Sequence, residues 1–322
     1  MNLLVTGGAG FIGSHFIERA IEDSGIQKLV NLDALTYAGN PANLAAVAGH
    51  PRYHFEYADL RDKNAVLRIV RDHAVTHVVH FAAETHVDNS IADPNAFIHT
   101  NVTGTFHLLE ACKETWNNEP RTKNLFLHVS TDEVYGSLQP GEPPFTEDSP
   151  FRPNSPYAAS KAAADHLVRS YTQTFGFPAV IVRCSNNYGP RQHSEKFIPT
   201  ILRCLRARAP IPLYGDGLQI RDWIHVSDHC SALRSLLTSG RLGDVCNIGA
   251  NNERTNLDLL VTICDLFDEA HPELGGNSRS LITHVTDRPG HDRRYAIDAS
   301  RLRHRFGWSP QAHFQKALHA LV

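Results

Sequence analysis

Two adjacent acids, Asp132 and Glu133, lie in the segment STDEVYG, directly after the apolar run NLFLHV. An elimination needs one group that accepts a proton and one that donates a proton, and two nearby carboxyls with different proton affinities can divide these tasks. Neighbouring residues of a regular strand point to opposite faces, so both acids reach one cleft only if the strand ends here. We expect such an end, because Tyr135 and Gly136 permit a turn; two solvated loop acids are the alternative.

A tyrosine and a lysine in NSPYAASK form a second candidate pair. Ser155 is a suitable N-cap and Pro156 suits the first position of a helix. Tyr157 and Lys161 then lie four residues apart on one helical face. A lysine ammonium near a phenol stabilises the phenolate, which can take the proton of a sugar hydroxyl while the carbon gives hydride to a nicotinamide. The spacing alone is common by chance, and its meaning depends on a dinucleotide site elsewhere in the chain.

The first glycine-rich turn, VTGGAGFIGSHF, supplies the dinucleotide pattern G-x-G-x-x-G. Its glycines are Gly8, Gly10 and Gly13, with Gly7 beside them. Glycines permit a tight turn and close approach to a pyrophosphate, which amides at the helix N-terminus then hold. Asp33 follows at the end of the next strand, where an acid accepts hydrogen bonds from an adenosine ribose. No arginine follows Asp33 closely, so the pattern favours NAD over NADP; a glycine turn without a ligand is the alternative.

Short β-branched runs alternate with helical stretches through the first half of the chain. The runs are LLVTG, KLVNLD, YHFEYAD, THVVHFAA and LFLHVST. This alternation is typical of a parallel sheet with helices on both faces. Together with the glycine turn it predicts an α/β fold with a Rossmann-type, doubly wound parallel sheet.

The composition changes near Ser185, where loops rich in Pro, Gly, Arg and Asn become frequent. Such loops commonly bind ligands. We therefore expect an NAD-binding domain over residues 1–184, to which some later segments return. Residues 185–322 are expected to form mainly a smaller ligand-binding lobe.

Charge and composition exclude several functional classes. The 322 residues carry 31 Lys and Arg against 34 Asp and Glu, without a basic block, so we expect no nucleic-acid partner. No segment resembles a signal peptide or a membrane span, which predicts a cytoplasmic protein without a membrane partner. The six cysteines are scattered and the twenty histidines form no ligand motif, so reduced thiols and no metal site are expected.

Long motifs along nearly the whole chain closely resemble the dTDP-glucose 4,6-dehydratases, within the extended short-chain dehydrogenase/reductase superfamily. Besides TGGAGFIG and YAASK they are LTYAGN, AAETHVDNS, STDEVYG, RCSNNYGP, EKFIP, PLYGDG, RDWIHVSDH, NIGANNERTN and DRPGHDRRYAID. The resemblance implies a carbon-oxygen lyase that oxidises C4 of the glucose unit, eliminates water across C5 and C6, and returns hydride to C6. NAD is regenerated in each cycle, and the product is a 4-keto-6-deoxy sugar.

The resemblance also implies roles for individual residues. Tyr157, supported by Lys161, is the base at C4, and Thr131 orients the C4 oxygen. Glu133 removes the C5 proton, and Asp132 protonates the departing hydroxyl. The expected cofactor residues are Gly7, Gly10, Phe11, Ile12, Gly13, Asp33, Leu35, Thr36, Asp59, Leu60, Ala82, Ala83, Thr100, Tyr157, Lys161 and Asn187. The expected substrate residues are Thr85, Thr131, Asn186, Lys196, Pro212, Tyr214, Arg221, Asn256, Arg288 and His291.

Arg221 and Arg288 also have a physical rationale, because a diphosphate bound to a chain of net charge −3 needs local positive charge. Surface salt bridges are the alternative for each arginine. The resemblance further implies a homodimer in which the helices of NVTGTFHLLEACKE and YAASKAAADHLVRSYTQTF pair with their mates. Thymine and uracil differ by one methyl group, so the sequence leaves dTDP-glucose and UDP-glucose both open as substrates.

Three other functions compete with the dehydratase. A 4-epimerase shares the glycine turn and Tyr157 with Lys161 but needs no Asp-Glu pair, because it only removes and returns hydride at C4. UDP-glucuronate decarboxylases and GDP-mannose 4,6-dehydratases tend to have serine where Asp132 stands. A non-catalytic dinucleotide-binding regulator has no reason to keep all five candidate catalytic residues.

The loop GPRQHSEK departs from the family pattern. Arg191, His193 and Ser194 replace residues that are more often Tyr, then Phe or His, then Pro, so a different loop shape over the substrate is expected. Family members also often continue beyond the last helical run, QAHFQKALHALV, and any contact from such a tail is expected to be missing.

Overall fold

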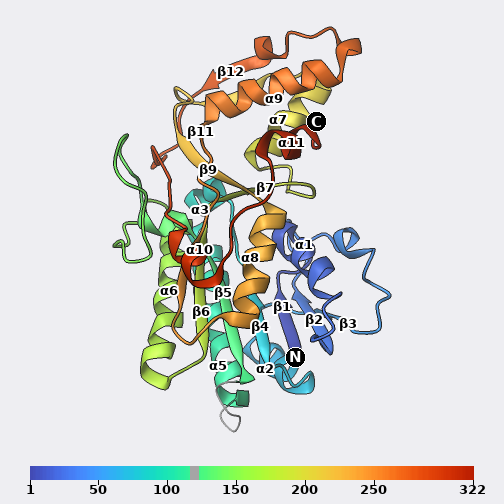
Figure 1. Cartoon of the computed structure of the whole chain (residues 1–322), viewed down its shortest axis with the longest axis vertical. Helices are drawn as coiled ribbons and strands as arrows, with labels where there is room; N and C mark the ends of the chain where they lie inside the picture. The colour runs from blue at the N-terminus through green and yellow to red at the C-terminus, as the bar shows by residue number, and fades with distance from the viewer. Residues whose placement is uncertain (117–122) are drawn as a thin grey trace.

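A seven-stranded parallel sheet forms the centre of the larger body in this computed structural model, which describes residues 1–116 and 123–322 (Figure 1). The strand order is β10-β6-β5-β4-β1-β2-β3, and all pairings are parallel. The strands are β1 (Asn2–Thr6), β2 (Lys28–Asp33), β3 (Tyr53–Tyr57), β4 (His77–His80), β5 (Leu125–Thr131), β6 (Ala179–Cys184) and β10 (Val245–Ile248). The doubly wound parallel sheet predicted from the sequence is confirmed, and so are its first five strands.

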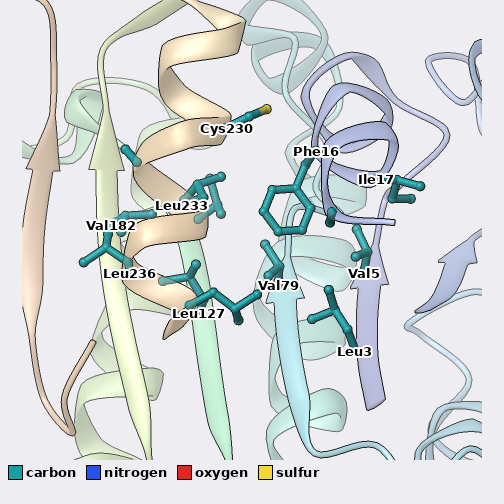
Figure 2. Close-up of a cluster of buried hydrophobic side chains, with 14 of the residues drawn as sticks. Leu3, Val5, Phe16, Ile17, Val79, Leu127, Val182, Cys230, Leu233 and Leu236 are labelled. Carbon is teal, nitrogen blue, oxygen red and sulfur yellow. The ribbon is translucent and has the colours of Figure 1, made fainter. Parts of the chain in front are cut away.

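Helices cover both faces of this sheet, which explains why its central strands are continuous apolar runs. One face is covered by α1 (Phe11–Ala20), α8 (Val226–Ser239) and α10 (Ser300–Phe306), whose apolar residues join one buried cluster with the sheet. The other face is covered by α2 (Lys63–Asp72), α5 (Thr105–Trp116) and α6 (Pro156–Phe175), which share a second cluster. Figure 2 shows part of the first cluster, where side chains of α1 and α8 pack over the sheet.

Short helical elements lie in the segments that follow β2, β4 and β5. A 3₁₀ turn, Pro41–Leu44, follows β2, and a second, Asp132–Tyr135, follows β5. Helices α3 (Val87–Ala92) and α4 (Pro94–Phe97) lead through a π-helical turn, Ile98–Gly104, into α5.

Helix α6 begins as its sequence predicts. The Ser155 hydroxyl accepts a hydrogen bond from the Ala158 amide at 3.1 Å, and Pro156 occupies the first turn. The helix ends before Gly176, which adopts a left-handed conformation with φ +59°. These caps fix the helical register that puts Tyr157 and Lys161 on the face buried against the sheet.

A smaller lobe with its own core lies above the larger body in Figure 1. It contains α7 (Phe197–Ala207), α9 (Asn256–Ala270) and α11 (Phe314–His319), together with the parallel pair β8 (Ile211–Tyr214) and β12 (Ile282–Val285). A three-stranded sheet is formed by β7 (Asn186–Tyr188), β9 (Ile220–His225) and β11 (Glu253–Thr255), in the order β11-β9-β7. Two 3₁₀ turns, Pro272–Leu274 and Ser278–Leu281, follow α9.

Three late segments, α8, β10 and α10, belong to the larger body although they lie beyond residue 185. Strand β10 extends the sheet beside β6, and the two helices pack on the face that α1 covers. The division into residues 1–184 and 185–322 stays a prediction, and these segments are those that cross it. Within the described residues, no helix is long and apolar enough to cross a membrane, and no group of three acidic, His or Cys side chains is arranged to hold a metal ion.

The packing of α8 on the sheet generates a stability prediction. Leu233 is fully buried in the cluster of Figure 2, whereas Leu242, just beyond the helix, is 53% exposed. Leu233→Ala is expected to lower the free energy of unfolding by about 2 to 5 kcal/mol, because it leaves a cavity between α8 and the sheet. Urea unfolding of this variant and of the control Leu242→Ala measures the difference. Equal stability of the two variants would show that Leu233 does not stabilise the packing of α8 on the sheet.

Candidate active site

The carboxyl ends of the central strands open on a cavity of about 600 Å³, at the edge where open α/β sheets bind ligands. It is lined by most of the residues that the sequence predicts for the cofactor: Gly7, Gly10, Phe11, Ile12, Gly13, Asp33, Thr36, Asp59, Leu60, Ala82, Ala83, Thr100, Tyr157, Lys161 and Asn187. The same wall includes the predicted catalytic residues Thr131, Asp132 and Glu133 and the predicted substrate residues Thr85, Asn186 and Lys196. The structure therefore brings three separate sequence motifs together in one cavity.

The glycine turn between β1 and α1 forms one end of the cavity. Gly7 has φ +69°, and a Cβ there would lie 2.8 Å from the backbone of Ala82. A Cβ on Gly13 would lie 2.4 Å from the carbonyl oxygen of Gly7. Helix α1 begins after Gly10, which provides no side-chain cap, so the amides of the first turn lack an intrahelical acceptor. This cradle fits a pyrophosphate, which needs both close backbone approach and free amide donors.

Asp33 ends β2 at the side of this cradle and is 7% exposed. Its two carboxylate oxygens accept hydrogen bonds from the Ala9 and Leu35 amides, each at 2.8 Å. Burial raises the pKa of Asp33, and the two amides partly oppose that rise. Each oxygen keeps a further lone pair, which suits it to ribose hydroxyls. Leu35 itself does not line the cavity; it is partly buried and packs against the first hydrophobic cluster.

The chain turns directly after β5, as the two adjacent acids require. Strand β5 ends at Thr131, and the 3₁₀ turn Asp132–Tyr135 follows. The Thr131 hydroxyl caps this turn by accepting a hydrogen bond from the Glu133 amide at 3.3 Å. The turn lets both acids face the cavity, which confirms the strand end that the sequence predicts.

The two acids differ in how strongly their surroundings favour the proton. Burial raises the pKa of Asp132 well above its ordinary value, and the charges of Glu133 and Asp222 raise it further, while Arg221 opposes them. Its Oδ2 atom has no hydrogen-bond partner among the described residues. Burial also raises the pKa of Glu133, but the charges of Arg288, Arg221 and Lys196 oppose this rise. Asp132 is therefore the better candidate for the protonated acid, and Glu133 for the carboxyl that ionises.

Tyr157 and Lys161 lie on α6 and are both buried. The Lys161 ammonium donates a hydrogen bond to the Val129 carbonyl of β5 at 2.8 Å, and burial lowers the pKa of Lys161 to about 8. Burial and then the charge of Glu133 raise the pKa of Tyr157 well above its ordinary value, whereas a hydrogen bond with Thr131 lowers it. The site thus favours the neutral phenol, and a phenolate would need additional positive charge nearby.

Six predicted substrate residues do not line the cavity: Pro212, Tyr214, Arg221, Asn256, Arg288 and His291. They lie in the smaller lobe or in the segment after β12. Arg221 is buried, donates to the Asp292 carbonyl at 3.0 Å and stacks 4.1 Å from the Tyr295 ring centre. Arg288 lies 3.7 Å from Asp88, and its buried Nε has no partner among the described residues. An unpaired guanidinium donor in this position suits an anionic ligand.

Other predicted residues have partners that limit their roles. The Asn187 side chain is used inside the protein, where Nδ2 donates to the Ser185 carbonyl at 3.0 Å and Oδ1 lies 2.9 Å from His229 Nδ1. Asp59 is held by Arg61 at 2.6 Å, and this ion pair lowers the pKa of the carboxyl. The Lys196 ammonium donates to the Thr85 carbonyl at 3.0 Å.

Several cavity residues were missed by the sequence analysis, including Arg61, Glu84, Cys184 and Ser185. Cys184 pairs with Thr131 in the register of β5 and β6, so it ends its strand at the same edge. The rule that ligands bind at the carboxyl ends of parallel strands would have found Cys184 and Ser185. Arg61 and Glu84 enter the site from loops, and no sequence pattern singles them out.

Known proteins similar to this chain support one family. The family model of GDP-mannose 4,6 dehydratase matches residues 4–321. A dTDP-glucose 4,6-dehydratase of Xanthomonas campestris is 52% identical over 98% of this chain and 90% of its own. The crystal structure of the dTDP-glucose 4,6-dehydratase DesIV from Streptomyces venezuelae, with NAD bound, has a TM-score of 0.90 at 44% identity, covering 99% of this chain and 95% of its own.

An enzyme of different activity shares the fold. The UDP-glucose 4-epimerase of Thermus thermophilus, in complex with NAD, has a TM-score of 0.87 at 32% identity and covers 99% of this chain and 97% of its own. The fold alone therefore does not separate the two activities, whereas identity over the full length does. With relatives of this identity along its whole length, the chain belongs to the dTDP-glucose 4,6-dehydratase family.

Proposed function

We propose that the protein is an NAD-dependent dTDP-glucose 4,6-dehydratase that converts dTDP-glucose into dTDP-4-keto-6-deoxyglucose and water. The observation that carries this proposal is the pair of adjacent carboxyls, one favoured as the acid and the other as the base, on the turn after β5. An epimerase has no use for such a pair. GDP-mannose 4,6-dehydratases and UDP-glucuronate decarboxylases tend to have serine in place of Asp132, so this residue argues against both.

The glycine cradle and Asp33 hold the cofactor in this proposal. When bound, NAD supplies the acceptor and later the donor of one hydride, and in its oxidised form a positive charge. Of the chain's own residues, the amides at the start of α1 bind the pyrophosphate and Asp33 accepts hydrogen bonds from the ribose. Asp59, Leu60, Thr36 and Thr100 surround the rest of the cavity.

Tyr157 takes the proton of the C4 hydroxyl as C4 loses hydride, and Thr131 orients that oxygen. The resulting ketone acidifies the C5 hydrogen, which Glu133 removes as a proton. Asp132 donates its proton to the C6 hydroxyl, so that the carbon-oxygen bond breaks and water leaves. Hydride then returns to C6 and a proton to C5, which leaves the 4-keto-6-deoxy sugar with no net oxidation.

The cationic residues around Glu133 account for substrate binding in the proposal. Arg221, Arg288 and Lys196 all act on the carboxyl of Glu133 through their charge, so they lie close enough to bind an anion beside it. A nucleoside diphosphate held by Arg288 and Arg221 would place its sugar toward the acid pair. Tyr214, His291, Asn256 and Pro212 are then the candidates for contacts along the nucleotide.

The protein is further proposed to act in the cytoplasm as a homodimer. Helices α5 and α6 pack side by side, and the exposed apolar side chains Ile98 and Phe106 lie on the segment that leads into and begins α5. Pairing of these helices with their mates would cover both side chains.

Glu133→Gln tests the proposed C5 base. The amide keeps the shape and hydrogen-bonding reach of Glu133 but accepts no proton, so oxidation at C4 should continue while elimination slows by about 10²- to 10⁴-fold. Reduced cofactor should accumulate, and its absorbance after mixing with dTDP-glucose measures this. The control Glu142→Gln changes an exposed loop acid and should dehydrate the sugar at the parent rate. Parent-like dehydration by Glu133→Gln would mean that Glu133 is an ordinary loop acid.

Asp132→Asn tests the proposed acid and the pH dependence. In the parent enzyme the rate should fall as pH rises through the raised pKa of Asp132, because the acid then lacks its proton. The variant should lose this basic limb and dehydrate about 10²- to 10⁴-fold more slowly, yet still exchange the C5 hydrogen with deuterated solvent. Mass spectrometry of recovered sugar nucleotide measures exchange, with the exposed Asp148→Asn as control. Retention of normal dehydration would remove Asp132 from the mechanism.

Phe106→Glu tests the proposed dimer. Phe106 is 39% exposed at the start of α5, and a charge buried in a helix-to-helix contact would oppose association. Light scattering at micromolar concentration should therefore give a dimer for the parent and a monomer for the variant. Leu242→Glu, at an exposed site beyond α8, should remain dimeric. A monomeric parent would overturn the proposal.

A further inference from the structure

The loop over residues 189–196 joins β7 to α7 and lines the cavity with Arg191, Gln192, His193, Ser194, Glu195 and Lys196. Arg191 has φ +67°, a left-handed conformation that is costly for a residue other than glycine. A bulky residue held in such a conformation calls for a compensating interaction.

The guanidinium of Arg191 makes such interactions with the larger body. It donates to both carboxylate oxygens of Glu18 on α1, at 2.8 and 2.5 Å, and to the Asn43 carbonyl at 2.6 Å. The side chains of Arg191 and Glu18 are 24% and 30% exposed. A bidentate, partly buried pair with an additional carbonyl acceptor is stronger than an ordinary surface salt bridge.

The partner Asn43 connects Arg191 to the glycine turn. Asn43 Nδ2 donates to the Ala9 carbonyl at 3.0 Å, and the Asn40 amide donates to the same oxygen at 3.0 Å. Ala9 lies inside the turn whose amides are suited to a pyrophosphate. The Arg191 contacts therefore tie the loop to α1 and, through Asn43, to the backbone of the glycine turn that lines the same cavity.

His15 also contacts Arg191, and this contact requires that the imidazole of His15 is neutral. Its Nδ1 lies 2.9 Å from Arg191 Nη2 and must accept that hydrogen bond, because guanidinium groups only donate. Its Nε2 then carries the proton and donates to the Pro190 carbonyl at 2.9 Å. The charged groups facing His15 are Arg191 and Glu18, with His225 as a further titratable neighbour. Protonation of Nδ1 would place an N–H against the guanidinium and break the contact.

We propose that Arg191 is a positioning residue that fastens the loop over residues 189–196 across the cofactor cavity and slows the release of NAD. The inference rests on the proposed function, in which one hydride leaves and returns within a single cycle, so the reduced cofactor must stay bound between the two steps. NAD that lies between the glycine turn and the loop leaves when the loop lifts. Lifting requires loss of the contacts of Arg191 to Glu18, Asn43 and His15.

Arg191→Asn is the direct test, because asparagine tolerates the left-handed conformation but lacks the guanidinium. Protein loaded with isotopically labelled NAD is mixed with excess unlabelled NAD, and the label that remains bound is followed over time. The variant should release NAD about 10- to 100-fold faster, the range expected for loss of hydrogen bonds between charged groups. With saturating NAD present, the variant should still dehydrate dTDP-glucose.

We call the contacts of Arg191 with Glu18, Asn43 and His15 the clasp. A second variant and a control distinguish loss of the clasp from a general loss of structure. Glu18→Gln keeps the shape but removes one charge, so release should accelerate about two- to fivefold. The double variant should be no faster than Arg191→Asn alone, because Glu18 acts through Arg191. Arg71→Gln breaks an exposed ion pair with Glu114 that lies away from the cavity, and should release NAD at the parent rate.

The pH dependence gives a third measurement. Burial and the charge of Arg191 lower the pKa of His15, so the neutral form that the clasp needs is present at neutral pH and is lost as pH falls through that pKa. Release from the parent should therefore accelerate as pH falls below about 6.5, the ordinary imidazole pKa, toward the lowered pKa of His15. His15→Gln can donate and accept without titrating, so its release rate should change less over this range.

The outcomes distinguish failure of the clasp from failure of the proposed function. A parent protein that does not hold NAD overturns the proposed function. A parent that holds NAD, together with an Arg191→Asn variant that releases it at the same rate, overturns the clasp and leaves the proposed function standing. If Arg191→Asn does not fold by circular dichroism, Glu18→Gln decides, and an unchanged release rate for that variant overturns the clasp.

Discussion

The acid–base chemistry of the site depends on two adjacent carboxyls, Asp132 and Glu133, that hold their protons with different strengths. Burial raises the pKa of both Asp132 and Glu133, and if nothing distinguished them they would share one proton without assigned roles. The distinction comes from the positive charges that reach Glu133 from Arg221, Arg288 and Lys196. Two of these belong to the smaller lobe or the segment after β12, and Lys196 lies just before α7. The lobe is therefore part of the acid–base chemistry as well as the expected place of substrate binding.

The parallel sheet supplies the other half of this arrangement. Its strands end together at one edge, so the glycine turn after β1, Asp33 at the end of β2 and the acid turn after β5 meet, although more than a hundred residues separate the first from the last. Helix α6 adds Tyr157 and Lys161 from the face packed on β5, where the Val129 carbonyl fixes the lysine. A fold in which strands alternate in direction would separate these groups to opposite edges.

Much of this arrangement is predictable from sequence because it is local. The glycine spacing, the Ser155 cap, the YxxxK pair and the strand end at Thr131 each depend on a few neighbouring residues, and the structure contains all of them. Contacts between distant segments were harder to predict from the sequence. The sequence predicted that some later segments return to the larger body, but not that these are α8, β10 and α10. Only tertiary packing decides which apolar helix covers which face. The hydrogen bonds of the Asn187 side chain inside the protein and the packing of Leu35 against the core likewise depend on neighbours that no local pattern identifies. Arg191 was recognised as a departure, but its partners on α1 and near Asn43 are visible only in the folded chain.

The neutral phenol of Tyr157 limits when this residue can act as a base in the proposed cycle. Buried near Glu133, Tyr157 holds its proton strongly, and Lys161 is engaged with Val129, so the tyrosine is a poor base unless further positive charge enters the cavity. In the proposed cycle, bound NAD in its oxidised form would supply that charge, and Tyr157 would then accept the proton of the C4 hydroxyl as C4 loses hydride. Loss of the cofactor would remove this charge, so a loop that slows the release of NAD would also preserve the basicity of Tyr157.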